Sequence, residues 1–523
     1  METDLKTVYP RTATWLPPGF RCAEIEKLPE LLLKHHELLR QTPFLADLAT
    51  VELALHRLSR SPPPLPETVA ETIIHPGLEL LEVEWKRLPD HLDDPEILPA
   101  AEKCLLLLLP GNENRKPRIF TAGNADLLAL KIVAEKIDPE EAASEGGVSI
   151  AAIESTIAAA VAKGLLLAPP SKIRRPAEFF NDERLYRRFS SSQMFTLQWH
   201  LTQKCDLHCR HCYDRSRRAE MSLGQGLGVL ESLDEFRRLN NVGVQVSFSG
   251  GNPLLYPHFF ELYEQTVRRG FQTAILGNTV KPSTLEEIVS IEKPQFFQVS
   301  LEGLKDHNDS IRGPGHFDGV VGFLRELRKM NIYSMVMLTL TSGNLKDVLP
   351  LADFLGDKVD LFTFNRLAQE GAGADLVPVN PAEYEDFLKD YLAAAARNPC
   401  MSLKDSLFNI LLQRQGTELI GGCTGYGCGA AFNFLSLLSD GEVHACRKMP
   451  SLLGNLFQES LEEIYQSATA AKYRSRSTGC RQCEIHPVCG GCPAVSRGYG
   501  LDIFSDVDPY CFKKKDPAVG NGS

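Results

Sequence analysis

Three cysteines, Cys205, Cys209 and Cys212, lie close together with C-x3-C-x2-C spacing in the segment KCDLHCRHCYDRS. Clustered thiols of this kind bind zinc ions or iron–sulfur clusters, and each of these normally takes four protein ligands. Three cysteines therefore mean either that a fourth ligand comes from elsewhere in the chain or that one coordination position stays open for another molecule.

The chain has fourteen cysteines, and eleven of them fall in two clusters, at 205–212 and 423–511. In a reducing compartment, clustered cysteines indicate metal or redox sites rather than disulfides. A disulfide-rich secreted domain is the less favoured alternative, because the N-terminus has no apolar signal-peptide core and the chain is long. The second cluster consists of Cys423, Cys428, Cys446, Cys480, Cys483, Cys489, Cys492 and Cys511.

The length, net charge and hydrophobic pattern of the chain exclude several classes of protein. A length of 523 residues suggests about three or four domains at roughly 100–200 residues each. The net charge of −11 argues against a general binder of nucleic acid or anionic membranes, which needs a basic face. The longest aliphatic run, near 105–109, is far shorter than the roughly 20 residues that span a bilayer. We therefore expect a cytoplasmic protein with neither a nucleic-acid nor a membrane partner.

The elements that position the first cysteine cluster begin near residue 195, where strand-like runs alternate with helical stretches such as 258–270 and 317–331. This order predicts an α/β fold with a parallel sheet, open or closed into a partial (β/α)6 barrel. The expected strands are 195–202, 244–250, 272–278, 295–302, 333–341 and 361–367.

Polar and glycine positions recur where these strands end. Cys205 follows the first strand, and Gly250, Asn278 and Glu302 end the next three. Ligands bind such sheets at the carboxyl ends of the strands. We therefore expect these residues at one rim of the barrel.

The chain before the barrel divides into two regions. Residues 1–66 are expected to be helical, up to a proline-rich segment. Residues 67–176 combine strand-like runs at 78–85 and 118–122 with helical stripes, of which 149–163 is the last. Strands followed by three helices and a terminal strand are typical of a winged-helix module.

The C-x3-C-x2-C motif after the first strand of such a barrel resembles the radical S-adenosylmethionine (SAM) superfamily. The resemblance implies that Cys205, Cys209 and Cys212 bind three irons of a catalytic 4Fe–4S cluster, while the fourth iron chelates the amino and carboxylate groups of SAM. Reductive cleavage of SAM would release a 5′-deoxyadenosyl radical that abstracts hydrogen. The competing interpretation of the triplet alone is a zinc knuckle or a chance cluster.

Further segments are similar to SAM-contacting parts of that superfamily. SGGNP (249–253) resembles a glycine-rich motif that usually ends Gly-Gly-Glu-Pro, so Asn252 offers a carbonyl dipole in place of a charge. LGNTV (276–280), VSLEG (299–303) and DHNDSIRGPGHF (306–317) resemble later motifs, although each alone could be a plain turn. The resemblance implies SAM contacts by His211, Gly250, Gly251, Asn252, Pro253, Asn278, Ser300, Glu302 and Arg312.

The C-terminal cysteines resemble the SPASM extension, which carries auxiliary 4Fe–4S clusters in radical SAM enzymes that modify peptides and proteins. Two departures are that Cys423 lies outside the core motif and that two residues separate Cys489 from Cys492, where three are usual. We expect two fully ligated auxiliary clusters that transfer electrons, with a pair of zinc sites as the alternative. The resemblance groups Cys423, Cys428, Cys446 and Cys492 in one cluster, and Cys480, Cys483, Cys489 and Cys511 in the other.

The winged-helix pattern resembles the RiPP recognition element, a small domain that binds the leader of a ribosomally synthesised peptide. DNA binding is the competing interpretation, but residues 126–163 hold three lysines, no arginine and seven acids. DNA affinity needs several cations that face phosphates. A purely structural domain is a third option.

These resemblances together predict an oxygen-sensitive radical SAM/SPASM enzyme that modifies a ribosomally made precursor peptide, by forming a thioether or carbon crosslink or by oxidising a side chain. The Gly-Gly-Asn-Pro motif and the long N-terminal region resemble selenobiotic-type peptide maturases. An electron donor such as a flavodoxin or ferredoxin is expected.

Two alternatives remain open. Sulfatase-maturase-like oxidation is disfavoured because Arg447 follows Cys446 where that family has an acidic base. A non-catalytic iron–sulfur regulator with a winged helix comes from a different class. The expected domains are 1–66, 67–176, 190–400 and 401–515, with a disordered tail at 516–523.

Overall fold

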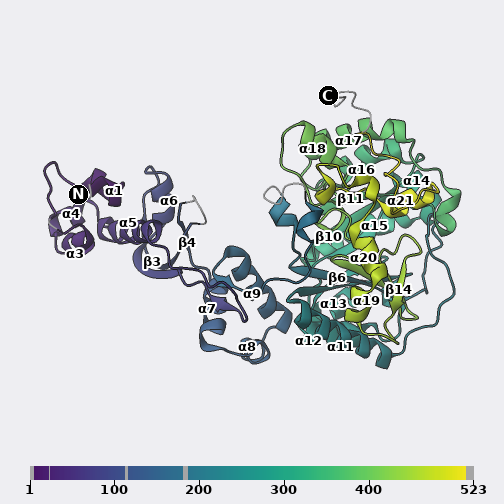
Figure 1. Cartoon of the computed structure of the whole chain (residues 1–523), viewed down its shortest axis with the longest axis horizontal. Coiled ribbons are helices and arrows are strands. Elements are labelled where there is room, and N and C mark those ends of the chain that lie inside the picture. Colours follow the sequence, from purple (N-terminus) through teal and green to yellow (C-terminus); the bar gives the residue numbers. More distant parts are fainter. Residues whose placement is uncertain (1–4, 23, 112–115, 181–185, 514–523) are drawn as a thin grey trace. The chain divides into compact units, whose positions relative to one another are not determined.

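A computed structural model describes residues 5–22, 24–111, 116–180 and 186–513. The chain forms two compact units, unit 1 (Met1–Pro170) and unit 2 (Ser171–Ser523). Each unit has hydrophobic clusters of its own, and Figure 1 labels the elements of both. The expected tail at 516–523 lies outside the described residues.

Unit 1 opens with helices and continues into a small antiparallel sheet. The helices include α3 (Leu28–Leu33), α4 (His36–Gln41) and α5 (Leu45–Arg60). The sheet has the order β2-β3-β4, from strands β2 (Glu79–Lys86), β3 (Ala100–Leu109) and β4 (Arg118–Thr121).

Three helices and a short strand complete unit 1, in the order that the sequence predicted. They are α7 (Asn124–Glu135), α8 (Pro139–Gly146), α9 (Ile150–Lys163) and β5 (Leu166–Leu167), which pairs antiparallel with β1 (Ile73–Ile74). Ser149 caps α9, because its hydroxyl accepts a hydrogen bond from the Ala152 amide at 3.1 Å. Within the described ranges, no helix by itself has the length and apolarity to cross a membrane, whereas α8 and α9 meet those criteria jointly but are bent by 115°.

The central strand β3 was not predicted from the sequence. Its aliphatic half, 105–109, lacks the alternation of a half-buried strand because both faces of this strand are covered. Leu106 and Leu108 pack with residues of α5, and Leu107 and Leu109 pack with residues of α7 and α9. A continuous apolar run is what burial on both faces requires.

Unit 2 is built on a nine-stranded sheet with the order β11-β10-β9-β8-β7-β6-β12-β13-β14. The six predicted barrel strands are present and parallel, and β6 and β11 do not pair with each other, so the barrel is partial. They are β6 (Met194–Thr202), β7 (Gly243–Gly250), β8 (Gln272–Leu276), β9 (Phe297–Ser300), β10 (Ser334–Leu340) and β11 (Leu361–Arg366).

Helices between the strands bury their apolar faces in one continuous core. In α15 the spacing of Phe317, Val320, Leu324 and Leu327 puts all four on the buried face. The helices are α11 (Leu223–Asn240), α12 (Phe259–Arg268), α13 (Pro282–Ile291), α15 (His316–Lys329), α16 (Val348–Leu355) and α17 (Pro381–Ala395).

The C-terminal region extends the barrel sheet, which the sequence did not predict. Strand β12 (Phe434–Leu437) pairs in parallel with β6, and β13 (Glu442–His444) and β14 (Leu452–Asn455) follow antiparallel. Unit 2 therefore contains both the barrel and the cysteine-rich C-terminal region. Short helices follow: α19 (Leu461–Gln466), α20 (Ala468–Ser475) and α21 (Pro493–Gly498).

Candidate active site

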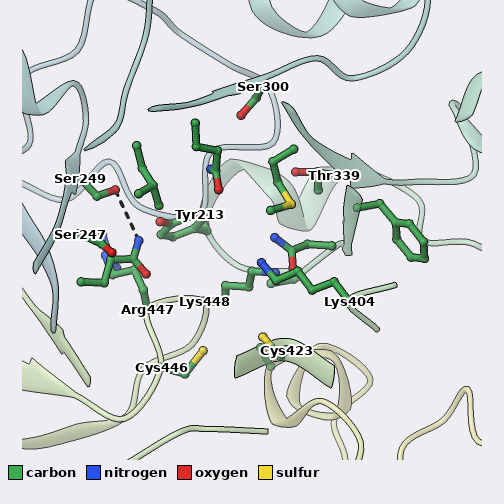
Figure 2. Close-up of a pocket in the computed structure, with 18 of the residues that line it drawn as sticks. Tyr213, Ser247, Ser249, Ser300, Thr339, Lys404, Cys423, Cys446, Arg447 and Lys448 are labelled. Carbon is green, nitrogen blue, oxygen red and sulfur yellow. Dashed lines mark hydrogen bonds between the residues drawn. The ribbon is translucent and has the colours of Figure 1, made fainter. Parts of the chain in front are cut away.

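A cavity of about 860 Å³ lies inside unit 2. Its wall carries polar side chains from the barrel strands, among them Ser247 and Ser249 of β7, Ser300 of β9 and Thr339 of β10 (Figure 2). Gln198 of β6 donates a hydrogen bond to Ser249 Oγ at 3.4 Å. Such a wall suits a polar ligand, whereas a barrel interior without a ligand would be filled by branched apolar side chains.

The three cysteines of the first cluster all lie on this wall, in the loop after β6. Cys205 Sγ accepts hydrogen bonds from the Leu207 amide at 3.4 Å and from Asn278 Nδ2 at 3.6 Å. Arg312 Nη1 donates to Cys209 Sγ at 3.7 Å. Burial raises the pKa of Cys209, and the Arg312 guanidinium acts against that rise. The loop therefore surrounds its sulfurs with donors and one positive charge.

Arg312 is held by a buried carboxylate. Glu302 is 1% exposed, and its Oε1 accepts from Arg312 Nε at 2.9 Å and from Nη2 at 2.6 Å. Its Oε2 accepts from the Thr339 amide at 2.7 Å, and His211 Nε2 lies 3.4 Å from Oε1. Burial alone would raise the pKa of Glu302, but His211 and Arg312 lower it overall. The carboxylate is therefore charged and positions Arg312 toward the cysteine loop.

The glycines of SGGNP permit close contact between two backbones. Gly250 has φ of 134°, and a Cβ there would lie 2.4 Å from the Thr202 carbonyl oxygen. A Cβ on Gly251 would lie 2.2 Å from the Lys204 carbonyl oxygen. Only glycine fits these positions, where the end of β7 packs against the start of the cysteine loop.

The Asn252 end of the SGGNP motif lies behind the cavity wall. Asn252 is 2% exposed; its Oδ1 accepts from the Leu254 amide at 3.3 Å and its Nδ2 donates to Asp206 at 3.2 Å. Asn278 Nδ2 also donates to Asp206, at 2.5 Å. Thus both polar ends of Asn252 are engaged within the protein.

The residues predicted to contact SAM divide into two groups. Those on the wall are His211, Gly250, Gly251, Asn278, Ser300 and Arg312. Asn252, Pro253 and Glu302 lie behind it, where they brace the first group. Direct contact of each residue with SAM stays a prediction.

The C-terminal cysteines also divide into two groups. The first group lines the same cavity and consists of Cys423, Cys428, Cys446 and Cys492. The described residues of the cavity wall do not include the second group, which consists of Cys480, Cys483, Cys489 and Cys511. Burial, followed by the Cys492 and Cys428 thiolates, raises the pKa of Cys446 to about 12. Burial also raises the pKa of Cys489 to about 12, with Cys511 contributing. Electrostatic neighbours thus fall within the two ligand sets that the resemblance grouped.

The chemistry of these sulfurs fits iron–sulfur ligation. All the cysteines that line the cavity, Cys205, Cys209, Cys212, Cys423, Cys428, Cys446 and Cys492, are free thiols. Thiols as buried as Cys446 and Cys489 ionise when a metal supplies the compensating positive charge. Within the described ranges, no three His, Cys, Asp or Glu side chains converge as on a single metal ion. In a 4Fe–4S cluster each cysteine instead binds its own iron.

Several wall residues had no role in the sequence prediction. Arg447 forms an ion pair with Asp214 and its guanidinium lies 4.8 Å from the centre of the Tyr213 ring. Asp214 and Tyr213 directly follow Cys212, which was a usable signal. Lys404 and Lys448 also line the cavity (Figure 2), but Lys404 lies in an irregular segment without any motif.

Two sequence profiles match this chain. The Radical SAM superfamily profile matches residues 199–355, and the profile of the SPASM iron–sulfur cluster-binding domain matches residues 428–493. Together with the partial barrel and its cysteine-lined cavity, these matches show that the chain contains a radical SAM domain followed by a SPASM domain. Its cofactors are SAM, a 4Fe–4S cluster and auxiliary iron–sulfur clusters.

Relatives share this architecture at low identity. The AdoMet-dependent heme synthase of Methanosarcina barkeri is 27% identical over 60% of this chain and 95% of its own. The antilisterial bacteriocin subtilosin biosynthesis protein AlbA of Bacillus subtilis is 24% identical over 58% of this chain and 69% of its own. The structure of Streptococcus suis SuiB bound to precursor peptide SuiA matches 78% of this chain and 96% of its own, with 17% identity and a TM-score of 0.50.

Proposed function

We propose that this enzyme modifies a ribosomally synthesised precursor peptide by hydrogen abstraction. Among the similar proteins, AlbA is named for the biosynthesis of the bacteriocin subtilosin, and SuiB was solved bound to the precursor peptide SuiA. The observation that carries the proposal is the extent of the SuiB match. It covers 78% of this chain, which is more than the two thirds that unit 2 makes up, so it extends into unit 1. The sequence matches to the heme synthase and to AlbA both leave about two fifths of this chain without a counterpart.

The cysteine loop would hold the catalytic cluster through Cys205, Cys209 and Cys212. SAM bound there supplies a 5′-deoxyadenosyl radical for hydrogen abstraction. Arg312 stabilises negative charge at the loop, because Glu302 orients its guanidinium toward Cys209. Polar side chains such as Ser300 hydrogen-bond the ligand and fix its orientation in the cavity.

Unit 1 would bind the leader of the peptide as an added strand at the β4 edge of its sheet. β4 is an edge strand, and its Phe120 packs in the same cluster as Ile157 and Val161 of α9. A peptide strand there would gain backbone hydrogen bonds from β4 and apolar contacts from α9. The acidic surface of this region favours a leader with basic residues over DNA.

The auxiliary clusters would transfer electrons, with Cys423, Cys428, Cys446 and Cys492 as ligands of the one nearer the cavity. A small protein such as a flavodoxin or ferredoxin would supply electrons to the catalytic cluster. We expect the enzyme to work in the cytoplasm, where thiols stay reduced.

The test is anaerobic incubation of the reconstituted full chain with SAM and a reductant. Wild type should produce 5′-deoxyadenosine, and the triple Cys205→Ala, Cys209→Ala, Cys212→Ala variant should produce none while it retains its auxiliary iron. Cys104→Ala, which changes an isolated cysteine, serves as the control and should keep full activity. SAM cleavage by the triple variant would disprove the assignment of the catalytic cluster, and no cleavage by wild type would favour a non-catalytic regulator.

The peptide itself is tested separately. Small open reading frames beside the gene should encode it, and a mass change in that peptide after incubation would establish the modification. If several such peptides are all recovered without a change in mass, the proposed substrate class is wrong.

A further inference from the structure

The cavity wall carries more positive than negative charge. Its acidic side chains, among the described residues, are Asp214 and Asp405. Its lysines and arginines are Arg215, Arg312, Arg366, Lys404, Arg447 and Lys448.

Most of these cations have partners inside the protein. Arg447 pairs with Asp214, and Arg312 pairs with Glu302 behind the wall. Arg366 donates to Asp405 at 2.7 Å and to both oxygens of Asp508 at 2.8 Å. Arg215 donates to the backbone carbonyl of Cys209 at 2.5 Å.

The side-chain ammonium groups of Lys404 and Lys448, which line the cavity, make neither a hydrogen bond nor an ion pair with any residue in the described ranges. Asp405 is adjacent in sequence to Lys404, but its Oδ2 accepts from Arg366 and its Oδ1 accepts from the Leu407 amide at 2.9 Å. The acidic groups of the wall are thus already engaged. Two ammonium groups on one cavity wall therefore lack a carboxylate partner.

The two lysines approach each other from different elements. Figure 2 shows their side chains converging between the sulfurs of Cys423 and Cys446 on one side and Thr339 on the other. Bringing two like charges together in a partly buried space costs free energy unless an anion lies between them.

The cysteine ligands are a second candidate for this anion, but other cations already face them. Arg476 and Arg175 are buried, and both donate to the Cys428 backbone carbonyl, at 3.0 and 3.3 Å. Both guanidinium groups also lower the pKa of Cys428, against the rise that burial causes. The two lysines add to this positive charge, because Lys448 lowers the pKa of Cys446 and Cys492, and Cys423 and Cys446 act against the fall that burial causes in the pKa of Lys404. Their ammonium groups thus lie between the cysteine ligands and the cavity.

We propose that Lys404 and Lys448 together bind a carboxylate of the substrate, either an acidic side chain or a C-terminal carboxylate, and so orient the reacting residue. The proposal rests on the proposed peptide substrate and names its chemical class. A carboxylate between two ammonium groups accepts charge-assisted hydrogen bonds on both oxygens. Substrates whose corresponding group is a neutral amide would bind more weakly.

The test uses reconstituted, anaerobic full-length protein and four probes. Two are acetyl-Gly-Glu-Gly-amide and acetyl-Gly-Gln-Gly-amide, and two are acetyl-Gly-Gly with a free or an amidated C-terminus. Calorimetric titration should give wild type about tenfold tighter binding of an acidic probe than of its amide. A preference within the Glu/Gln pair would identify an acidic side chain as the source of the carboxylate, and a preference within the acetyl-Gly-Gly pair would identify the C-terminus.

Substitutions test whether the lysines cause the preference. Lys404→Met and Lys448→Met should each reduce it to within about twofold, and Lys404→Arg should retain most of it, because the charge remains. Lys346→Met changes an exposed lysine away from the cavity and should leave it unchanged. Iron content and EPR of the reduced auxiliary clusters, recorded on each variant, report on cluster assembly.

The outcomes separate the explanations. Equal binding of acidic and amide probes by wild type, or a preference that survives both Met variants, overturns the proposal. A changed auxiliary-cluster EPR signal with an unchanged preference assigns the lysines to the cluster and also overturns it. If a Met variant loses iron, the proposal is judged from the preference for acidic probes in wild type and in Lys404→Arg. Production of 5′-deoxyadenosine from SAM by the same wild-type preparation shows that the radical SAM function stands independently of this result.

Discussion

Glu302 and Arg312 form an ion pair that is nearly removed from solvent, with side chains 2% and 10% exposed and a shortest N–O distance of 2.6 Å. The pair lies directly behind the cysteine loop, since Arg312 also donates to Cys209 Sγ. Removing one partner of such a pair leaves the other charge buried and unpaired.

Glu302→Gln should therefore destabilise the protein strongly. We expect a loss of about 3–5 kcal/mol in the free energy of unfolding, the range for breaking a buried ion pair. Anaerobic denaturant titration measures it. Asp318→Asn disrupts the exposed pair with Lys305 and is the matched control, for which we expect no measurable change. Equal stability of the two variants would contradict the structural role of Glu302.

Asp508→Asn should cost the enzyme one cluster. Asp508 Oδ2 accepts from the Cys492 amide and from Arg366 Nη2, and Oδ1 accepts from Arg366 Nη1, all at 2.8 Å. An amide in either orientation would place its NH2 group against one of these donors and would also remove the charge that compensates Arg366. Cys492 would lose its position, so iron content should fall by about one third if three 4Fe–4S clusters are present. Asp506→Asn, at an exposed carboxylate, is the control and should retain all the iron. A full iron complement in Asp508→Asn would refute this prediction.

His486 should make stability depend on pH. Burial, followed by Arg476 and Arg175, lowers its pKa from 6.5 to about 3. The folded protein then keeps His486 neutral while the unfolded chain takes up a proton below its pKa of about 6.5. Stability is therefore full above that pH and falls as the pH decreases, by about 1 kcal/mol between pH 6.5 and about 5.5.

His486→Gln removes this proton and should flatten the pH dependence by that amount. Unfolding free energies of both proteins at several pH values between about 5.5 and 7.5 provide the comparison. An identical slope for wild type and variant would mean that His486 is protonated in the folded state.

Thr121→Pro should weaken leader binding without disrupting the sheet of unit 1. The Ala122 amide donates to Leu105 in β3, so by alternation along the strand the Thr121 amide points away from β3. Proline at this exposed edge position removes one donor available to an added strand. Peptide affinity of the full chain should fall about fivefold to tenfold, from one lost hydrogen bond.

Glu82→Pro on β2, the opposite edge of the same sheet, is the control for that experiment. It should leave peptide affinity unchanged if β4 is the docking edge. Reversed results for the two variants would move the docking site to β2.

The barrel could be predicted from the sequence because its signals are local. All six strands alternate with amphipathic helices, and Cys205 follows β6 within the expected loop. The pairing of β12 with β6 could not be predicted, because it joins segments more than two hundred residues apart and depends on tertiary packing. Strand β3 was missed because burial on both faces removes the alternation that identifies strands.

The site was predictable to the same extent. The cysteines and Gly250 could be predicted from their spacing in the sequence. The role of Glu302 behind the wall could not, because it depends on the tertiary contact between Glu302 and Arg312. Lys404 carries no sequence signal, since nothing near it repeats a motif and only the fold brings it opposite Lys448.

The parallel pairing of β12 with β6 has a consequence for engineering chimeric enzymes. Strand β6 leads into the Cys205 loop, and β12 and β13 lead to Cys446, so the two cluster regions share one rigid ladder that begins at Thr196 and Phe434. A graft that slips this register by one residue would turn every side chain of β12 to the opposite face. The exchangeable module is therefore the whole nine-stranded sheet with both cysteine regions attached, and a transplanted C-terminal segment must bring a matching β6 with it.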